Sequence, residues 1–315
     1  MSRPRVSILI PTLNAERDLE QLLPALAEQE LEGGLEVRVI DSDSTDATRQ
    51  ILRAAGIPVT RIERSTFRHG ATRNQLAREA EGEFCLFLSQ DATPAGPGFV
   101  TALLAPFADE RVAGATARVL PNPSDDPLTA RTVLAAPEAD DRSEVRAIAS
   151  PAAFAEMDAS ERLRHLRFNN VASCIRADIL REIPFPDLAF GEDSAWAARA
   201  LTAGWKVAFV AEAVVHHAHE YGAAEAFERY RVDAAFHRRT HDYRVRPNLG
   251  SVVRGLLYEI REDYRFIRRH DASLVHLWRS PSLRGGQVLG QYFGSRGWRP
   301  GGKDAGSRPA TRRFS

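Results

Sequence analysis

The sequence predicts an α/β protein built on a doubly wound, mainly parallel β-sheet. Two features of the first hundred residues support this prediction. Short apolar runs alternate with segments whose apolar residues recur at helical spacing, and each apolar run stops abruptly in polar residues. Alternating strands and helices favour parallel strands joined by right-handed crossovers. With 315 residues, of which 43% are hydrophobic, the chain can bury a large core.

Four strands are expected in this region, each a short apolar run closed by turn-forming residues. They cover residues 6–10, 35–40, 58–62 and 83–88. The first intervening helix should span residues 16–29, because its leucines recur at helical spacing, and the second should span residues 48–55 behind an Asp or Ser cap. A third helix is expected over residues 70–80.

The rest of the chain is less regular. We expect a helix over 99–107, a strand over 112–119, a loop with a short helix over 120–137, and a segment of uncertain order over 140–164. A helix over 194–203, stopped by Gly204, and a strand over 205–210 follow. The segments 223–239 and 251–269 have the apolar stripes of amphipathic helices and carry many arginines.

Polar side chains follow three of the expected strands. Thr12 and Asn14, Asp41 and Asp43, and Asp91 all fall at strand ends, which in an open parallel sheet meet at the edge where ligands bind. This edge lacks both GxGxxG and GxxxxGK[ST], so a dinucleotide turn or an NTPase loop is not expected. Acidic strand ends suit hydrogen bonds to a base or ribose and a metal on a diphosphate. The alternative is that the aspartates cap helices and form turns.

Composition narrows the class of protein. Formal net charge is zero, but from residue 226 onward there are about 19 basic against about 8 acidic residues. Such a segment suits lipid head groups or phosphates, or it is simply a solvated arginine-rich surface. Cys85 and Cys174 have no metal-ligand spacing, and no apolar run is long enough to span a membrane. We therefore expect a cytoplasmic protein without a leader peptide.

Four motifs, in order and spacing, resemble inverting family-2 glycosyltransferases of the GT-A fold. They are VSILIPTLN, IDSDSTDAT, FRHGATRNQLAREAEGEFCLFLSQDATP and FGEDSAWAARALTAGWKVAFVAEAVVHHAH, within residues 4–225. The combination FxHGxTRN and FLxQDAxP is similar to rhamnosyltransferases of bacterial surface-polysaccharide assembly. The resemblance implies a nucleotide-diphospho-sugar donor, preferably dTDP-L-rhamnose, and a glycan or polyprenyl-diphosphate-linked acceptor.

The resemblance also implies roles for particular residues. The nucleotide and donor would be bound by one set, which is Pro11, Thr12, Asn14, Asp41, Asp43, His69, Gly70, Arg73, Asn74, Gln90, Asn170 and Trp196. Without the resemblance, each of three residues has another interpretation. Arg73 fits a surface residue of an amphipathic helix, Asn170 fits a turn former, and Trp196 fits a core residue. Asp193 would act as general base and Glu192 would orient hydroxyl groups, although two acids at a helix start also fit simple capping.

The metal motif is where the chain departs from the family pattern. The position of the first family carboxylate holds Ser89, so only Asp91 remains of the DxD pair. A divalent cation, Mg²⁺ or Mn²⁺, is still expected, because diphosphate oxygens and water supply most of its ligands. His217 and His219 alternate in an extended segment and would supply the missing contact or bind phosphate. The alternative is that both are structural histidines.

These expectations give a domain plan. The GT-A catalytic domain should cover residues 1–222, with a donor half over 1–95 and an acceptor half over 96–222. A basic helical extension over 223–285 should follow, then a disordered tail over 286–315. The extension suits docking on the inner leaflet of a membrane or packing on other protein, and no nucleic-acid partner is expected. A transferase using a UDP-sugar, and a catalytically silent module that binds nucleotide sugar or scaffolds an assembly complex, are the alternative functions.

Overall fold

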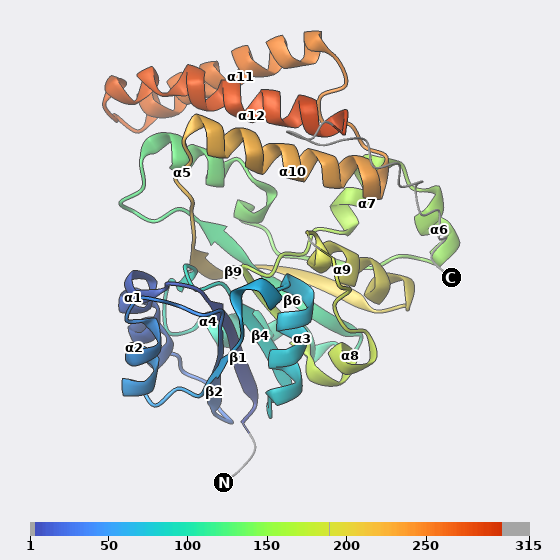
Figure 1. The fold of residues 1–315 in the computed structure, drawn as a ribbon. Coiled ribbons are helices and arrows are strands. Elements are labelled where there is room, and N and C mark those ends of the chain that lie inside the picture. Colours follow the sequence, from blue (N-terminus) through green and yellow to red (C-terminus); the bar gives the residue numbers. More distant parts are fainter. Residues whose placement is uncertain (1–3, 189, 298–315) are drawn as a thin grey trace. The chain divides into compact units, whose positions relative to one another are not determined.

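The computed structural model describes residues 4–188 and 190–297 of the chain. These residues form two compact units, each assembled from separate stretches of sequence. The first contains residues up to 124, 132–157 and 164–218, and the second contains 125–131, 158–163 and the residues from 219 on. Figure 1 shows the elements along the chain. No helix among the described residues is long and apolar enough to cross a membrane.

The first unit contains one nine-stranded sheet in the order β3-β2-β1-β4-β8-β6-β9-β5, with β7 paired to β9. Parallel pairing joins β1 to β2 and β4, β2 to β3, and β6 to β9, whereas β5, β7 and β8 pair antiparallel. The strands are β1 Val6–Thr12, β2 Leu35–Asp41, β3 Val59–Arg61, β4 Phe84–Leu88, β5 Thr93–Pro94, β6 Val112–Leu120, β7 Glu144–Arg146, β8 Ala172–Arg176 and β9 Lys206–His216.

Helices cover both faces of this sheet, as its strand pattern requires. On β1, Ile8 belongs to one hydrophobic cluster and its neighbour Leu9 to the other, because successive side chains point to opposite faces. The first cluster receives α1, α2 and α4, and the second receives α3, α8 and α9. Their bounds are α1 Glu16–Ala27, α2 Thr48–Ala54, α3 His69–Glu79, α4 Phe99–Leu104, α8 Ala177–Glu182 and α9 Glu192–Thr202. The predicted doubly wound α/β fold is therefore confirmed.

Shorter elements complete the chain. They are η1 Arg64–Thr66, η2 Ala105–Ala108, α5 Pro127–Leu134, η3 Pro137–Ala139, α6 Pro151–Glu156, α7 Ala159–His165 and η4 Leu274–Trp278. Helices α5 and α7 each cross from one unit to the other along the chain. Both cysteines are buried in the sheet, and burial raises the pKa of Cys85 to about 12 and that of Cys174 well above its usual value. Neither thiol is a reactive group.

The second unit is built on three helices, α10 Ala223–His241, α11 Leu249–Arg269 and α12 Ser280–Ser295 (Figure 1). Helix α12 corrects the expectation of disorder from residue 286; residues 298–315 of that expected tail lie outside the described residues. Three glycines of this helix, Gly286, Gly290 and Gly294, recur every four residues and face α10. A Cβ atom on any of them would lie well inside 3.0 Å of a backbone oxygen of α10.

A buried network of ion pairs joins α11 to α5 and α12. Asp263 of α11 is fully buried and lies 2.7 Å from Arg284 Nη2 of α12 and 2.6 Å from Arg131 Nε of α5. Arg131 also pairs with Glu259, one turn earlier on α11. Because removing one partner of a buried pair leaves an uncompensated charge, this network fixes which face of α11 points inward.

Candidate active site

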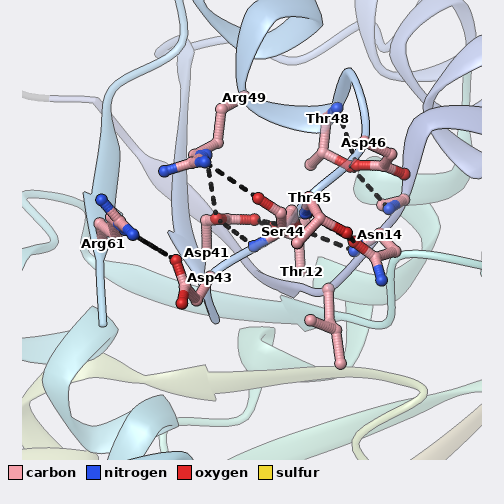
Figure 2. A network of polar contacts seen from close by, with 12 residues as sticks. Thr12, Asn14, Asp41, Asp43, Ser44, Thr45, Asp46, Thr48, Arg49 and Arg61 are labelled. Atoms are coloured by element: carbon pink, nitrogen blue, oxygen red, sulfur yellow. Dashed lines mark hydrogen bonds and ion pairs between the residues drawn. The ribbon is translucent and has the colours of Figure 1, made fainter. Parts of the chain in front are cut away.

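The carboxyl end of β2 carries a buried aspartate held entirely by protein donors (Figure 2). Asp41 accepts hydrogen bonds from Thr12 Oγ1 at 3.1 Å, from Ser44 N at 3.0 Å and from Ser44 Oγ. Arg49 Nε lies 3.6 Å from its Oδ1. A carboxylate has about four acceptor positions, and these contacts use them. Asp41 therefore organises the loop that follows β2, and a nucleotide contact would have to share its oxygens.

Two residues of the adjoining loops adopt the left-handed backbone conformation. Asn14 has φ 50° and Asp43 has φ 67°. Asn14 Oδ1 accepts a hydrogen bond from Thr45 N at 2.9 Å, which ties the loop after β1 to the loop after β2. Asp43 is partly exposed and pairs with Arg61 at the end of β3 (Figure 2). Pro11 lies partly exposed within β1 beside them.

Arg49 and Arg61 belong to this polar edge, although neither was predicted from the sequence. Arg49 stands in the first turn of α2, and its Nη2 donates to Ser44 O at 2.9 Å. Arg61 is the last residue of β3, the strand next to β2. Arg61 could have been predicted from the sequence, because its strand ends at the same edge of the sheet as the strands that precede the aspartates. Arg49 lies inside an amphipathic helix and carries no such signal.

Gln90, at the end of β4, links that strand to the loop after β1. Its Oε1 accepts from Leu13 N at 2.8 Å, and its Nε2 donates to Asp18 Oδ2 at 2.7 Å. The side chain predicted to contact the donor thus spans two protein segments. Its position explains why a glutamine follows Ser89: the amide can both donate and accept, which a carboxylate cannot.

Asp91 and His217 come together from the loop after β4 and the end of β9. His217 Nδ1 lies 3.2 Å from Asp91 Oδ1. Oxygen and nitrogen atoms that occupy adjacent positions around an octahedral cation are about 3 Å apart when each lies about 2.1 Å from the metal. The donor pair therefore fits a divalent cation. His219 begins the last stretch of the second unit, where its ring lies 5.7 Å from that of Tyr221.

A second charged cluster joins α3 to the start of α9. Arg73 Nη1 lies 2.6 Å from Glu192 Oε1, and both side chains are less than a tenth exposed. Asn170 Nδ2 donates to the same oxygen at 3.4 Å. His69 Nδ1 lies 3.4 Å from Arg73 Nη1, and burial, with the arginine's charge, lowers its pKa. Arg73 therefore balances a buried carboxylate and is not a surface residue.

Asp193 follows directly and has a perturbed pKa. Burial and then the charge of Glu192 raise the pKa of Asp193 to about 7, against lowering contributions from the Ser194 N–H, Arg73 and the Asn170 N–H. Gly191, at φ 79°, precedes the helix and turns the chain so that both acids stand in its first turn. A carboxyl with this pKa exchanges its proton near neutral pH, which is what a general base requires.

Three other residues that were predicted to bind the donor make close contacts with protein atoms. Asn74 exchanges two hydrogen bonds with the backbone of Phe185, at 2.8 and 3.0 Å. Trp196 is fully buried, and its Nε1 donates to Ile183 O at 2.8 Å, so the core alternative holds and it forms no wall for a ligand. A Cβ on Gly70 would collide with the Pro186 carbonyl oxygen. Gly70 therefore permits close packing of protein on protein.

The sheet carries acidic residues at its strand ends, an acid pair next to an arginine, and a carboxyl with a pKa near neutrality. Together these are the features of a glycosyltransferase that uses a nucleotide-sugar donor. The family model described as Glycosyl transferase family 2 matches residues 7–176, and the chain belongs to this family. The match runs from β1 to the end of β8, so it includes the polar edge, Arg73, Asp91 and Asn170.

Individual proteins show the same relationship. The O-antigen chain rhamnosyltransferase RfbN of Salmonella typhimurium (strain LT2) is 30% identical over 239 residues, which are 74% of this chain and 72% of the relative. The mannosyltransferase PcManGT from Pyrobaculum calidifontis, solved with GDP-Man and Mn²⁺, superposes with a TM-score of 0.54 at 19% identity and covers 93% of this chain and 72% of that chain. Staphylococcus aureus TarS 1–349 gives a TM-score of 0.53 at 18% identity, with 91% of each chain covered. These structures confirm the GT-A fold.

Proposed function

We propose that the protein is an inverting glycosyltransferase that moves L-rhamnose from dTDP-rhamnose to a hydroxyl of a glycan or polyprenyl-linked glycolipid. The observation that carries the inverting chemistry is the carboxyl of Asp193, whose pKa of about 7 suits a general base. The identity with an O-antigen chain rhamnosyltransferase supports the choice of sugar. Such an acceptor suits a cytoplasmic enzyme, peripheral on the inner face of the cell membrane.

In this mechanism Asp193 takes the proton of the acceptor hydroxyl. The acceptor oxygen forms a bond to the anomeric carbon from the face opposite the nucleotide, and the bond from that carbon to the diphosphate oxygen breaks. Glu192 keeps the pKa of Asp193 high, while Arg73 neutralises Glu192 and keeps the two acids in place.

The nucleotide would lie along the polar edge. Thr12, Asn14 and Asp41 would shape its base and ribose pocket, and Asp43 with Arg61 would border it, because these two side chains retain exposed surface. Asp91 and His217 would hold a divalent cation, with His219 two residues along the chain as a further ligand. When bound, this cation supplies positive charge to the leaving diphosphate.

Release of nucleotide from dTDP-rhamnose, compared with UDP-sugars and with Mg²⁺ or Mn²⁺, tests the proposal. We expect turnover with dTDP-rhamnose and its loss in Asp193→Asn, which should still bind dTDP. Asp187→Asn is the matched control, because Asp187 is an exposed carboxyl in the loop before α9. Asp91→Asn should raise the metal concentration needed for half-maximal turnover. Unchanged turnover in Asp193→Asn would refute the assignment of the base.

A catalytically silent module is the second candidate, and Ser89 in the place of the first metal carboxylate favours it. Such a module would bind nucleotide sugar or scaffold an assembly complex. It predicts tight binding of nucleotide with no release from any donor and acceptor. A protein that releases UDP instead of dTDP would support the third possibility, a UDP-sugar-dependent transferase.

A further inference from the structure

The outward side of α11 carries an exposed apolar stripe. Leu249, Val253 and Leu257 recur every four residues and are 65%, 58% and 64% exposed. Tyr264, two turns further, is also exposed and falls on the same side at 100° per residue. Isolated apolar side chains on a surface are ordinary, but a row along one side of a helix is not. We name these four residues the α11 stripe.

A row of arginines runs beside the α11 stripe. Arg254, Arg261, Arg265 and Arg268 are exposed and fall within about 60° of one another around the helix, adjoining the stripe. Arg265 pairs with Glu262 at 2.6 Å. Within the part of the chain that the structure describes, Arg254, Arg261 and Arg268 form no ion pair. The outward side of α11 is therefore apolar and cationic together.

The helix cannot turn this stripe inward. The inward side of the helix carries Val252 and Gly255, both buried, and the buried Asp263, which Arg131 and Arg284 hold. Rotating α11 to bury the stripe would turn Asp263 away from Arg131 and Arg284 and leave these two buried arginines without their carboxylate partner. The exposed stripe is thus a fixed feature of the folded unit.

We propose that α11 docks on the surface of a bilayer that contains anionic lipids. The α11 stripe would enter the boundary between head groups and acyl chains, and the arginine row would contact lipid phosphates. The segment after α11 adds exposed Leu274, Val275 and Trp278, and tryptophan favours this boundary. The inference deepens the peripheral location proposed above and does not depend on the identity of the donor.

Sedimentation of the full-length protein with vesicles tests this proposal. We expect binding to phosphatidylcholine vesicles that contain phosphatidylglycerol, weaker binding to phosphatidylcholine alone, and release by salt. The double variant Val253→Ser with Leu257→Ser should lose binding by at least tenfold, because both lost side chains are apolar. Arg261→Gln and Arg268→Gln should each weaken binding about fivefold, since each arginine near an anionic surface contributes roughly 1 kcal/mol.

Matched controls lie in the first unit. Val145→Ser removes an exposed apolar side chain, and Arg142→Gln an exposed arginine, so neither should change vesicle binding. No binding to anionic vesicles, or binding that the α11 variants leave unchanged, would overturn the proposal. A self-associating protein that the double variant converts to monomer, with no vesicle binding, would instead identify the stripe as an interface between copies. Vesicle binding is measured without turnover. A protein that does not bind vesicles can therefore still release nucleotide in the glycosyltransferase assay, and the two proposals can fail separately.

Discussion

The titration of Asp193 gives a prediction that needs no substrate. Its pKa rises from the ordinary value of 3.8 for an aspartate to about 7 in the folded protein, with burial and then the charge of Glu192 as the main causes. The folded state therefore binds this proton more tightly than the unfolded chain does. Its stabilising effect is complete below about pH 4 and is lost as the pH rises to about 7. A shift of roughly three pKa units corresponds to about 4 kcal/mol, an upper limit because the side chain keeps some access to solvent.

Chemical unfolding of the wild type and of Asp193→Asn between pH 4 and pH 8 measures this effect. The free energy of unfolding of the wild type, taken relative to the variant, should fall steadily to about pH 7 and stay level above it. Asp187→Asn controls for the loss of one negative charge, and its difference from wild type should not follow this course. A difference for Asp193→Asn that is independent of pH, or that grows with pH, would refute the assignment of a raised pKa.

Three further predictions concern the acid pair, the helix set and the polar edge. Glu192→Gln should move the acid limb of the pH profile of kcat/KM to lower pH, because the charge of Glu192 raises the pKa of Asp193; a limb that stays or rises contradicts this. Gly290→Ala should lower the free energy of unfolding by about 1–3 kcal/mol through collision with α10, whereas Gly285→Ala, in open space, should raise it by about 0.5–1 kcal/mol; similar effects at both sites would exclude tight packing. Asp41→Asn should cost about 1–3 kcal/mol in chemical unfolding and weaken dTDP binding in calorimetry, since an amide donor replaces one of the two oxygens that accept hydrogen bonds from the loop; normal stability and affinity would exclude that role.

Periodicity and strand-end chemistry were enough to predict the donor half of the sheet. The run Phe84–Leu88 is buried on both faces in β4, as its continuous apolar character indicated, and the polar residues after β1 and β2 do meet at one edge. These features are local in sequence. Each strand carries its own burial pattern, and parallel pairing then fixes which ends lie together.

Long-range partners could not be predicted in the same way. Arg73 and Glu192 are 119 residues apart in the sequence. The helical pattern around Arg73 did not predict their ion pair, and neither did the two acids at the start of α9. Gln90 and Asn74 were expected to contact the donor because of the motifs they stand in, yet their amides bond to Leu13 and Phe185. A motif identifies a position that matters, but it does not reveal the protein contacts that the same side chain makes.

The prediction of disorder from residue 286, which rested on a composition rich in glycine and arginine, was wrong for α12 for a related reason. Glycine disfavours an isolated helix, so a glycine-rich segment predicts flexibility. Against α10, however, the same missing side chains let two backbones approach each other. Only the partner helix, which lies about sixty residues earlier in the chain, turns an unfavourable helix residue into a favourable contact.

The discontinuous assembly of the second unit limits how the protein can be divided. A chain shortened after residue 222 would keep Arg131 of α5 and lose Asp263 and Glu259, both of its ionic partners. It would also uncover Leu128, which is almost fully buried and whose carbonyl accepts a hydrogen bond from Arg284. An isolated catalytic portion therefore requires redesign of residues 125–131 and 158–163, and a shortened chain that aggregates would say nothing about catalysis.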